Sequence, residues 1–313
     1  MILKETNKPI LVIGSSGLDV ISYISNPIQT QVSNPAEIRP SFGGVARNIA
    51  ENLARLGQSV NLISVVGKDA IGKQLLEFTA GAGVNTQACL TATYNTATYL
   101  AMLDLDRKLQ FGFYDMNILD HINVDYLDQH KALFAQASLV FFDTNLKPNV
   151  IRHIFHLAHI NKIPVCADTT SVDQAHRLTP YIQRLYLISA NQHEAAILCE
   201  CKDEIDSPDS GIEAARELIS RGAQMVVVSL GEHGVCYANS ETSGHIPAIR
   251  TPVLDPTGAG DALTAALLFG LLNDIDLDEA VRLGVTASSL TLRHAGAVLP
   301  DLSLEKLYNE LVL

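Results

Sequence analysis

The chain has 313 residues, of which 47% are hydrophobic and 18% charged, so it can bury a large core and differs clearly from a disordered protein. Its net charge of −12 argues against binding a nucleic acid polymer, which requires a basic face. The N-terminus lacks the pattern of a secretion signal, and no apolar run reaches membrane-spanning length. Five scattered cysteines suit a reducing compartment. We therefore expect a cytoplasmic protein with no membrane partner.

Apolar runs alternate with segments of helical spacing along the chain. A strand is predicted at Ile10–Gly14, a helix over residues 45–56 and a second strand at Val60–Val66. This alternation predicts an α/β fold in which helices cover both faces of a mostly parallel sheet, giving three layers. Later elements that continue it are strands at Leu139–Asp143, Pro164–Asp168, Leu185–Ser189 and Met225–Ser229, and helices near Asn149–His159, from His193, and near Gly211–Arg221.

Ligands of such sheets bind beyond the carboxyl ends of the strands. Polar residues follow several of the predicted strands and should therefore gather at one edge of the sheet. They are Asp19, Asp143, Asp168, Asn191 and the turn that begins at Ser229.

Two excursions interrupt the alternation, at about residues 20–42 and 96–115. We interpret them as a small β-sheet that forms a lid on a single domain spanning residues 1–313. An ordinary edge hairpin is the alternative, because a sequence does not show which way a hairpin projects. Exposed strand edges favour pairing, so a homodimer through the lid is expected. The β-prone segments are Val20–Ile24, Thr98–Leu103 and Leu109–Tyr114, with a turn at Asp104–Lys108.

The segment Asp255-Pro-Thr-Gly-Ala-Gly-Asp261 combines glycines, a helix start and an acid. Small residues let the backbone approach an anion, and the first turn of a helix adds N–H donors and partial positive charge. Asp261 would lie in that turn and face whatever attacks a bound phosphate. The alternative is a glycine-rich turn before a helix, capped by an acid.

Gly43-Gly44 opens the helix that contains Arg47 and Asn48. Two glycines allow close approach of a ligand, and the amide of Asn48 offers a donor and an acceptor to vicinal hydroxyls. A glycine turn with a surface Asn is the alternative. Arg47 is either a solvated charge or a contact for a polar group of the substrate.

Two further motifs follow predicted strands. Asn191 and Glu194 have the spacing of a helix capping box, and they are also residues that outer-shell Mg²⁺ binding would use. The glycines of Ser229-Leu-Gly231-Glu-His-Gly234 would let the backbone pass close to an adenine or a phosphate. A plain hairpin explains this second motif equally well.

In this order, Gly43-Gly44 with Asn48, Asn191 with Glu194, Ser229-Leu-Gly231 and Thr257–Asp261 resemble the ribokinase-like (PfkB) family of small-molecule kinases. The resemblance spans nearly the whole chain. Within that family, residues 33–54 and Asp115–Ile118 are most similar to pseudouridine kinases. The resemblance implies ATP-dependent phosphorylation of a primary hydroxyl, here the 5′-hydroxyl of pseudouridine. Ribose, another sugar or a different nucleoside are alternative acceptors, and a non-catalytic sugar or nucleotide sensor is the alternative of another class.

The resemblance also implies a role for each matching residue. Asp261 is the catalytic base, and the anion hole consists of Gly258, Ala259 and Gly260. The substrate-binding residues are Asp19, Gly43, Gly44, Arg47, Asn48, Asn117 and Asn145. Those at the ATP site are Asn191, Ser229, Gly231 and Gly234, with Glu194 holding Mg²⁺ through water and Asp255 holding a monovalent cation such as K⁺. Pro256 departs from the family, which often has Thr there, and this weakens the potassium assignment.

Overall fold

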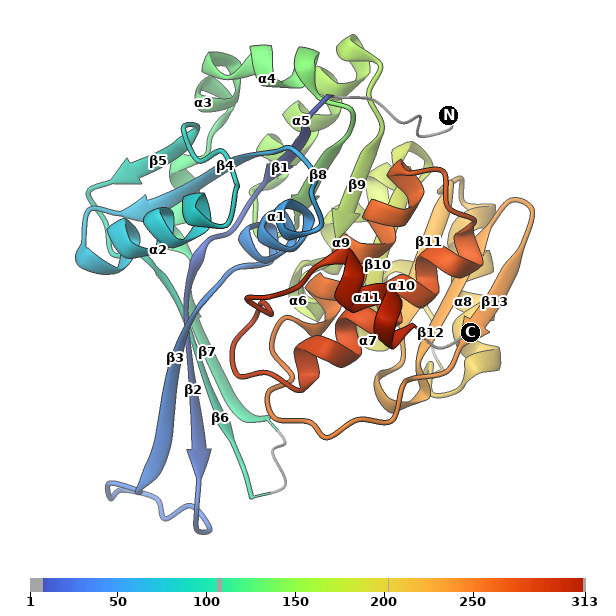
Figure 1. Cartoon of the computed structure of the whole chain (residues 1–313). Helices are drawn as coiled ribbons and strands as arrows, with labels where there is room; N and C mark the ends of the chain where they lie inside the picture. The colour runs from blue at the N-terminus through green and yellow to red at the C-terminus, as the bar shows by residue number, and fades with distance from the viewer. Residues whose placement is uncertain (1–7, 106–108, 202, 312–313) are drawn as a thin grey trace.

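The structure is a computed structural model that describes residues 8–105, 109–201 and 203–311. Nine of the described strands form a central sheet (Figure 1). Seven neighbouring strands, from β11 to β5 in spatial order, run parallel, which confirms the predicted mostly parallel sheet. Strand β12 is antiparallel to β11, and β13 is antiparallel to β12. In spatial order the strands are β13 (Ser243–Ile246), β12 (Val235–Asn239), β11 (Met225–Ser229), β10 (Leu187–Asn191), β9 (Val165–Asp168), β8 (Val140–Asp143), β1 (Ile10–Ile13), β4 (Val60–Gly67) and β5 (Cys89–Ala92).

Helices cover both faces of this sheet, as predicted. Strand β1 shows why: Leu11 and Ile13 belong to one hydrophobic core, whereas Ile10 and Val12 belong to the other, so both faces of the strand are buried. The helices that contribute to the first core are α3 (Val124–Gln129), α4 (Lys131–Gln136), α5 (Pro148–Asn161), α7 (Gln192–Cys199) and α8 (Pro208–Ser220). Those that contribute to the second are α1 (Val45–Arg55), α9 (Ala259–Leu272), α10 (Leu277–Leu292) and α11 (Leu304–Glu310).

The remaining helical segments are short or lie at the edge of the sheet. None of the described helices is long and apolar enough to cross a membrane. The predicted strand boundaries are correct to within three residues; β10 begins at Leu187 rather than Leu185 because the N–H of Leu185 closes the preceding 3₁₀ turn on Ile182. The remaining helical segments are α2 (Ala70–Gly81), α6 (Val172–Ala175), and the 3₁₀ helices η1 (Asn117–His121), η2 (His176–Arg184) and η3 (Gly231–His233).

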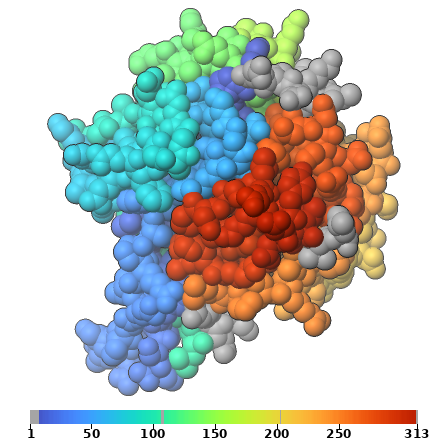
Figure 2. All heavy atoms as spheres, in the orientation of Figure 1, coloured from blue at the N-terminus to red at the C-terminus, as the bar shows by residue number. Residues whose placement is uncertain are grey.

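A second sheet, which we call the small sheet, projects from the body beside the C-terminal helices (Figures 1 and 2). Its strand order is β3 (Ala36–Gly43), β2 (Gly17–Ile24), β6 (Ala97–Leu103) and β7 (Leu109–Asp115). The two predicted excursions are therefore strands of one sheet. The predicted turn at Asp104–Lys108 includes residues 106–108, which lie outside the described residues.

Strand β2 starts earlier than predicted, and Asp19 consequently lies inside a strand of the small sheet rather than in a loop after β1. Gly17 permits this start because it pairs with Gly43 on one side and Ala97 on the other. A Cβ atom on Gly17 would lie 2.6 Å from the carbonyl oxygen of Ala97. The short connection from β1 therefore carries Asp19 directly into the small sheet.

Candidate active site

A cavity of about 330 Å³ lies between the small sheet and the carboxyl end of the central sheet, within the size range of small-molecule sites. It brings together residues from elements that are far apart in the sequence. Those predicted to bind substrate or catalyse the reaction are Asp19, Gly44, Asn48, Asn145, Gly258 and Asp261. The other lining residues are Ser15, Val45, Tyr99, Tyr114, Met116, Thr170, Ser171, Gln174 and Thr257.

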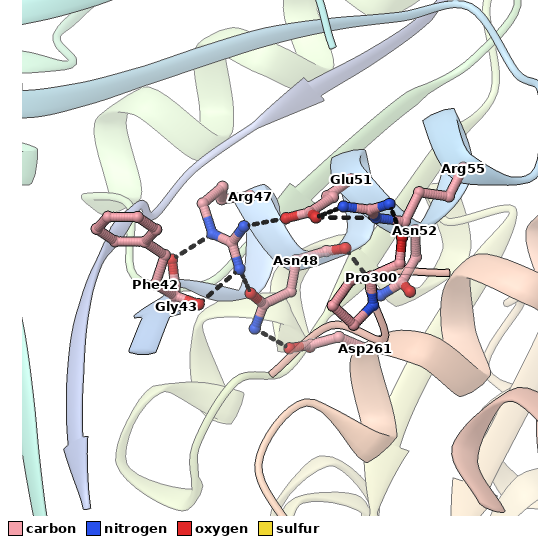
Figure 3. Close-up of polar contacts among 9 residues, drawn as sticks. All are labelled: Phe42, Gly43, Arg47, Asn48, Glu51, Asn52, Arg55, Asp261 and Pro300. Atoms are coloured by element: carbon pink, nitrogen blue, oxygen red, sulfur yellow. Dashed lines mark hydrogen bonds and ion pairs between the residues drawn. The ribbon is translucent and has the colours of Figure 1, made fainter. Parts of the chain in front are cut away.

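Asp261 lies in the first turn of α9 and reaches the cavity beside the N-terminus of that helix. Its Oδ2 accepts a hydrogen bond of 2.6 Å from Nδ2 of Asn48 (Figure 3). Burial raises the pKa of Asp261 to about 6, while the hydrogen bond from Asn48 and the charge of Arg47 act in the opposite direction. At neutral pH this carboxylate is ionised and is a stronger base than an ordinary aspartate.

Asp19 is the second acid at the cavity, and it is 7% exposed. Burial raises its pKa to about 7; the charge of Arg47 lowers it, and those of Asp261 and Asp255 raise it further. Gly43 lies beside it, and a Cβ atom there would overlap the Asp19 carboxylate in its present position. The glycine thus makes room for the acid rather than for the ligand itself.

Asp143, at the end of β8, organises the floor of the cavity. It is fully buried, and its Oδ2 accepts from the N–H and the hydroxyl of Ser15, at 2.7 and 2.6 Å, and from the N–H of Ala46 at 3.1 Å. Its Oδ1 accepts from the N–H of Asn145 at 3.0 Å. One carboxylate therefore joins the loop after β1, the start of α1 and the loop after β8. Burial raises the pKa of Asp143, and its hydrogen-bond donors oppose that shift.

The loop before α9 has a conformation that requires glycine at position 258. Gly258 is the N-cap and has a left-handed φ of 76°. Asp255 is 2% exposed and holds the loop in place: Oδ1 accepts from the N–H of Thr257 at 2.9 Å, and Oδ2 accepts from the N–H of Gly296 at 3.0 Å. Both oxygens of Asp255 are therefore bound to backbone groups of this region.

The capping interpretation of Asn191 and Glu194 is confirmed. Oδ1 of Asn191 accepts from the N–H of Glu194 at 3.0 Å, and Oε2 of Glu194 accepts from the N–H of Asn191 at 2.9 Å. Oε2 of Glu194 also accepts from the hydroxyl of Thr169 at 2.5 Å. Burial, followed by the charge of Glu194, raises the pKa of Asp168 well above its usual value. Two carboxyl groups thus lie close together at this end of the sheet.

Three predicted substrate-binding residues do not line the cavity: Gly43, Arg47 and Asn117. Arg47 is only 1% exposed, so the interpretation as a solvated charge is wrong; its side chain lies behind Asn48 and borders a second cavity of about 480 Å³. Asn117 is exposed, and its Nδ2 donates to Asp115 at 2.8 Å. The sequence did not reveal the positions of the Arg47 and Asn117 side chains, because the direction of a side chain depends on its tertiary contacts.

The predicted nucleotide-site residues lie around the end of β11. Ser229 pairs with Asn191 of β10, so both stand at the carboxyl edge of the sheet, but outside the cavity of about 330 Å³. Gly231 has a φ of 58° and no atom within 4 Å of its potential Cβ position. Gly234 has a φ of 95°, and a Cβ there would overlap the carbonyl oxygen of Ile246, so the hairpin itself requires this glycine.

Sequence reasoning missed the two lining tyrosines of the small sheet and the lining residues of the segment after β9. Tyr99 and Tyr114 face each other across β6 and β7, and Tyr99 also pairs with Asp19. The period-2 alternation of the two predicted strands contained this signal. Gln174 lies six residues after the end of β9, and apart from this position nothing in the sequence indicated that it lines the cavity.

Comparison with known proteins identifies the family of the chain. The model of the pfkB family of carbohydrate kinases matches residues 7–303. Pseudouridine kinase of Escherichia coli K12 is 32% identical over 297 residues, covering 94% of each chain, and guanosine-inosine kinase of Exiguobacterium acetylicum is 28% identical, covering 90% of this chain and 93% of that protein.

Solved structures show the same fold. The structure of Arabidopsis thaliana ribokinase complexed with ribose and ATP matches with a TM-score of 0.85 at 21% identity, covering 98% of this chain and 99% of that one. A carbohydrate kinase from Agrobacterium tumefaciens has a TM-score of 0.81 at 26% identity, with 97% of each chain covered. The chain therefore belongs to the pfkB family of carbohydrate kinases and is an ATP-dependent phosphotransferase with an alcohol group as acceptor.

Proposed function

We propose that this enzyme transfers the γ-phosphoryl group of ATP to the 5′-hydroxyl of pseudouridine, with Asp261 as the catalytic base. The observation that carries the proposal is the meeting of Asp261, Asn48 and Asp19 in one cavity at the N-terminus of α9. The similarity to a pseudouridine kinase supports the choice of acceptor.

The chemistry follows from the acidity of the groups. An alcohol is a far weaker acid than Asp261, so the carboxylate takes the proton as phosphoryl transfer proceeds and does not form an alkoxide beforehand. Asn48 and Asp19 hold hydroxyls of the ribose, which donate to the Asp19 carboxylate and favour its charged form. The amides of Gly258, Ala259 and Gly260 stabilise charge on the transferring phosphoryl oxygens.

The cation sites belong to the same proposal. Among the described residues no three His, Cys, Asp or Glu side chains are grouped to hold a metal ion. Magnesium in kinases uses one or two carboxylates together with substrate phosphates and water, and Glu194 beside Asp168 fits that donor set. Bound Mg²⁺ would neutralise charge on the phosphates. Asp255 is the residue proposed for K⁺, and ATP would lie along Asn191, Ser229, Gly231 and Gly234.

Gln174 supports a nucleoside over a free sugar. Its side chain lines the cavity, and its buried Oε1 has no hydrogen-bond partner within the part of the chain that the structure describes. An unpaired amide oxygen costs free energy until a donor reaches it. The imide N–H of a pyrimidine base is such a donor, and free ribose has no group in its place.

An acceptor panel tests this proposal by ADP release with pseudouridine, uridine, inosine and ribose. Pseudouridine is expected to have the highest kcat/KM. In Gln174→Met the KM for pseudouridine should rise about 10-fold, as expected for a lost hydrogen bond in a buried site, with the KM for ribose unchanged. Equal effects on both acceptors would contradict the role of Gln174.

The panel also separates the alternatives. If pseudouridine is inert and ribose or inosine turns over, the acceptor is wrong and the kinase assignment stands. If a ligand raises the melting temperature but no acceptor releases ADP, the chain is a sensor. A general loss of activity in Gln174→Met, with every acceptor affected, would indicate a folding role for the residue.

The small sheet is proposed as a lid and as the contact of a homodimer. Asp19, Tyr99 and Tyr114 lie on its cavity face, whereas Leu100 and Phe113 pair on the opposite face and are 41% and 61% exposed. Such an apolar face with free strand edges suits a second copy of the chain. Light scattering should give a dimer mass for the unmodified protein and a monomer mass for Leu100→Glu/Phe113→Lys; a monomeric unmodified protein would contradict the proposal.

A further inference from the structure

A continuous series of polar side chains runs from Asp261 to the segment at Pro300 (Figure 3). Asn48 donates to Asp261, and Arg47 donates through Nη2 to Oδ1 of Asn48. Arg47 also donates through Nη1 to Glu51. On the other oxygen of Glu51, Arg55 donates through Nε at 2.9 Å and Nη2 at 2.7 Å, and Arg55 in turn donates to the carbonyl of Pro300.

Arg47 dictates which way the amide of Asn48 points. A guanidinium has donors only, so the Asn48 atom that faces it must be the carbonyl oxygen. The amide nitrogen of Asn48 must then face Asp261, which accordingly receives a donor. If the amide turned over, an oxygen would oppose the carboxylate and a donor would oppose the guanidinium. Arg47 thus acts on the base without touching it.

Arg47 has little freedom to move. Its Nε donates to the carbonyl of Gly43 at 2.9 Å and its Nη2 to that of Phe42 at 2.8 Å, the last two residues of β3. The guanidinium is therefore fixed to the strand of the small sheet that leads into α1. The same planar group joins the end of that strand to the amide that orients Asp261.

Glu51 makes the buried position of Arg47 tolerable. Its side chain is fully buried and shares its two oxygens between Arg47 and Arg55. A lone buried guanidinium would be strongly destabilising, because it would leave an uncompensated charge away from water. An apolar side chain would fill the same volume without that cost, so the charged pair is retained for more than packing.

We propose that Arg47 is a positioning residue for the catalytic base: through Asn48 it holds the Asp261 carboxylate in the orientation that receives the acceptor proton, and it couples that orientation to strand β3. The proposal rests on the proposed role of Asp261 as the base. It assigns Arg47 no contact with substrate.

Arg47→Lys is the first test. Lysine keeps a positive charge for Glu51 but has no planar fork, so it cannot hold Asn48, Gly43 and Phe42 together. We expect kcat to fall about 10- to 100-fold, the range for a small misplacement of a catalytic group, with the KM for ATP unchanged. Unchanged kcat in this folded variant would overturn the proposal.

The pH profile of kcat is a readout that a purely structural role would not move. Without the fixed donor of Asn48 the Asp261 carboxylate is less favoured, so the acid limb should move to higher pH, by about half a unit or more. The charged and titratable groups around Asp261 are Arg47 from α1, Asp19 from β2, Asp143 from β8, Asp168 from β9 and Glu194 from α7. An acid limb identical to that of the unmodified enzyme would count against the proposal.

Arg55→Met is the matched control, because it removes the other partner of Glu51 and leaves the contact of Arg47 with Asn48 in place. We expect its kcat to stay within about threefold of the unmodified enzyme. An equal loss of kcat in Arg55→Met and Arg47→Lys would assign the network a structural role only. Arg47→Met/Glu51→Met, which removes both buried charges, should reproduce the kinetics of Arg47→Lys if that single variant does not fold.

Nuclear magnetic resonance of the unmodified enzyme gives a test without substitutions. The side-chain N–H signals of Asn48 and Arg47 should shift together with pH as Asp261 titrates, and static signals would overturn the proposal. Asp261→Asn separates failure of the proposed base from failure of the proposed positioning role of Arg47. If Asp261→Asn retains turnover, the assignment of the base fails; if it is inactive and Arg47→Lys is fully active, only the positioning role fails.

Discussion

Asp261→Asn is expected to lower kcat by about 10³-fold, because asparagine cannot accept the proton of the acceptor hydroxyl. The KM for ATP should stay within about twofold, since the amide keeps the shape of the side chain and an oxygen for Asn48. Steady-state ADP release with pseudouridine measures both constants. Turnover at the level of the unmodified enzyme would remove the central claim.

The same substitution should stabilise the fold above neutral pH. The pKa of Asp261 is raised to about 6 from 3.8, so its stabilising contribution is present at low pH and is lost as pH rises through 6. Asp261→Asn avoids that loss and should have a free energy of unfolding about 1–3 kcal/mol higher at pH 8. At pH 4 the two proteins should unfold at nearly the same denaturant concentration, and a gain of the same size at both pH values would contradict the explanation.

Asp19, the second acid of the cavity, also has a raised pKa. Burial and the charges of Asp261 and Asp255 raise its pKa to about 7, although Arg47 opposes them. Two acids with raised pKa values therefore face one cavity. Ribose hydroxyls that donate to Asp19 would favour its ionised form, so acceptor binding and the ionisation of the acids are linked.

The three layers of the fold could be predicted from the sequence, and so could the positions where glycines allow close contact. Alternating apolar runs predicted the parallel sheet because both faces of each strand are buried, as in β1. The sequence singled out Gly44 and Gly258 for close approach of a ligand; in the structure both have a positive φ, and a Cβ atom on either would overlap neighbouring backbone atoms. Asp261 was found from its place in the first turn of the helix that follows.

Side-chain contacts that depend on the folded chain could not be predicted from the sequence. Arg47 looks like a surface or substrate residue in a helix, and only the folded chain shows it enclosed by Glu51, Asn48 and the end of β3. Asp143 ends a strand like many acids, yet it binds Ser15, which is 128 residues away in the sequence. Partners so far apart leave no local pattern, because their spacing is set by the strand order and not by helical or strand periodicity.

Gly258→Ala is expected to damage the enzyme more than any other single methyl group in the loop before α9. The residue has a φ of 76°, and a Cβ atom there would overlap the carbonyl oxygen of Ala297. Left-handed strain and this collision should lower the free energy of unfolding by about 2–4 kcal/mol. Displacement of the loop should also lower kcat about 100-fold if its amides have the proposed role of stabilising the transferring phosphoryl group.

Gly260→Ala is the matched control for stability within the same turn. Gly260 lies inside α9 without a positive φ, and no atom lies within 4 Å of its potential Cβ position. Alanine should therefore raise the free energy of unfolding by about 0.5–1 kcal/mol, the usual gain over glycine in a helix. Denaturant unfolding of both variants measures these changes. An equal loss of stability in the two variants would show that the turn depends on small residues in general. A loss in Gly258→Ala with a gain in Gly260→Ala would show that glycine is required at the left-handed N-cap, beside Ala297.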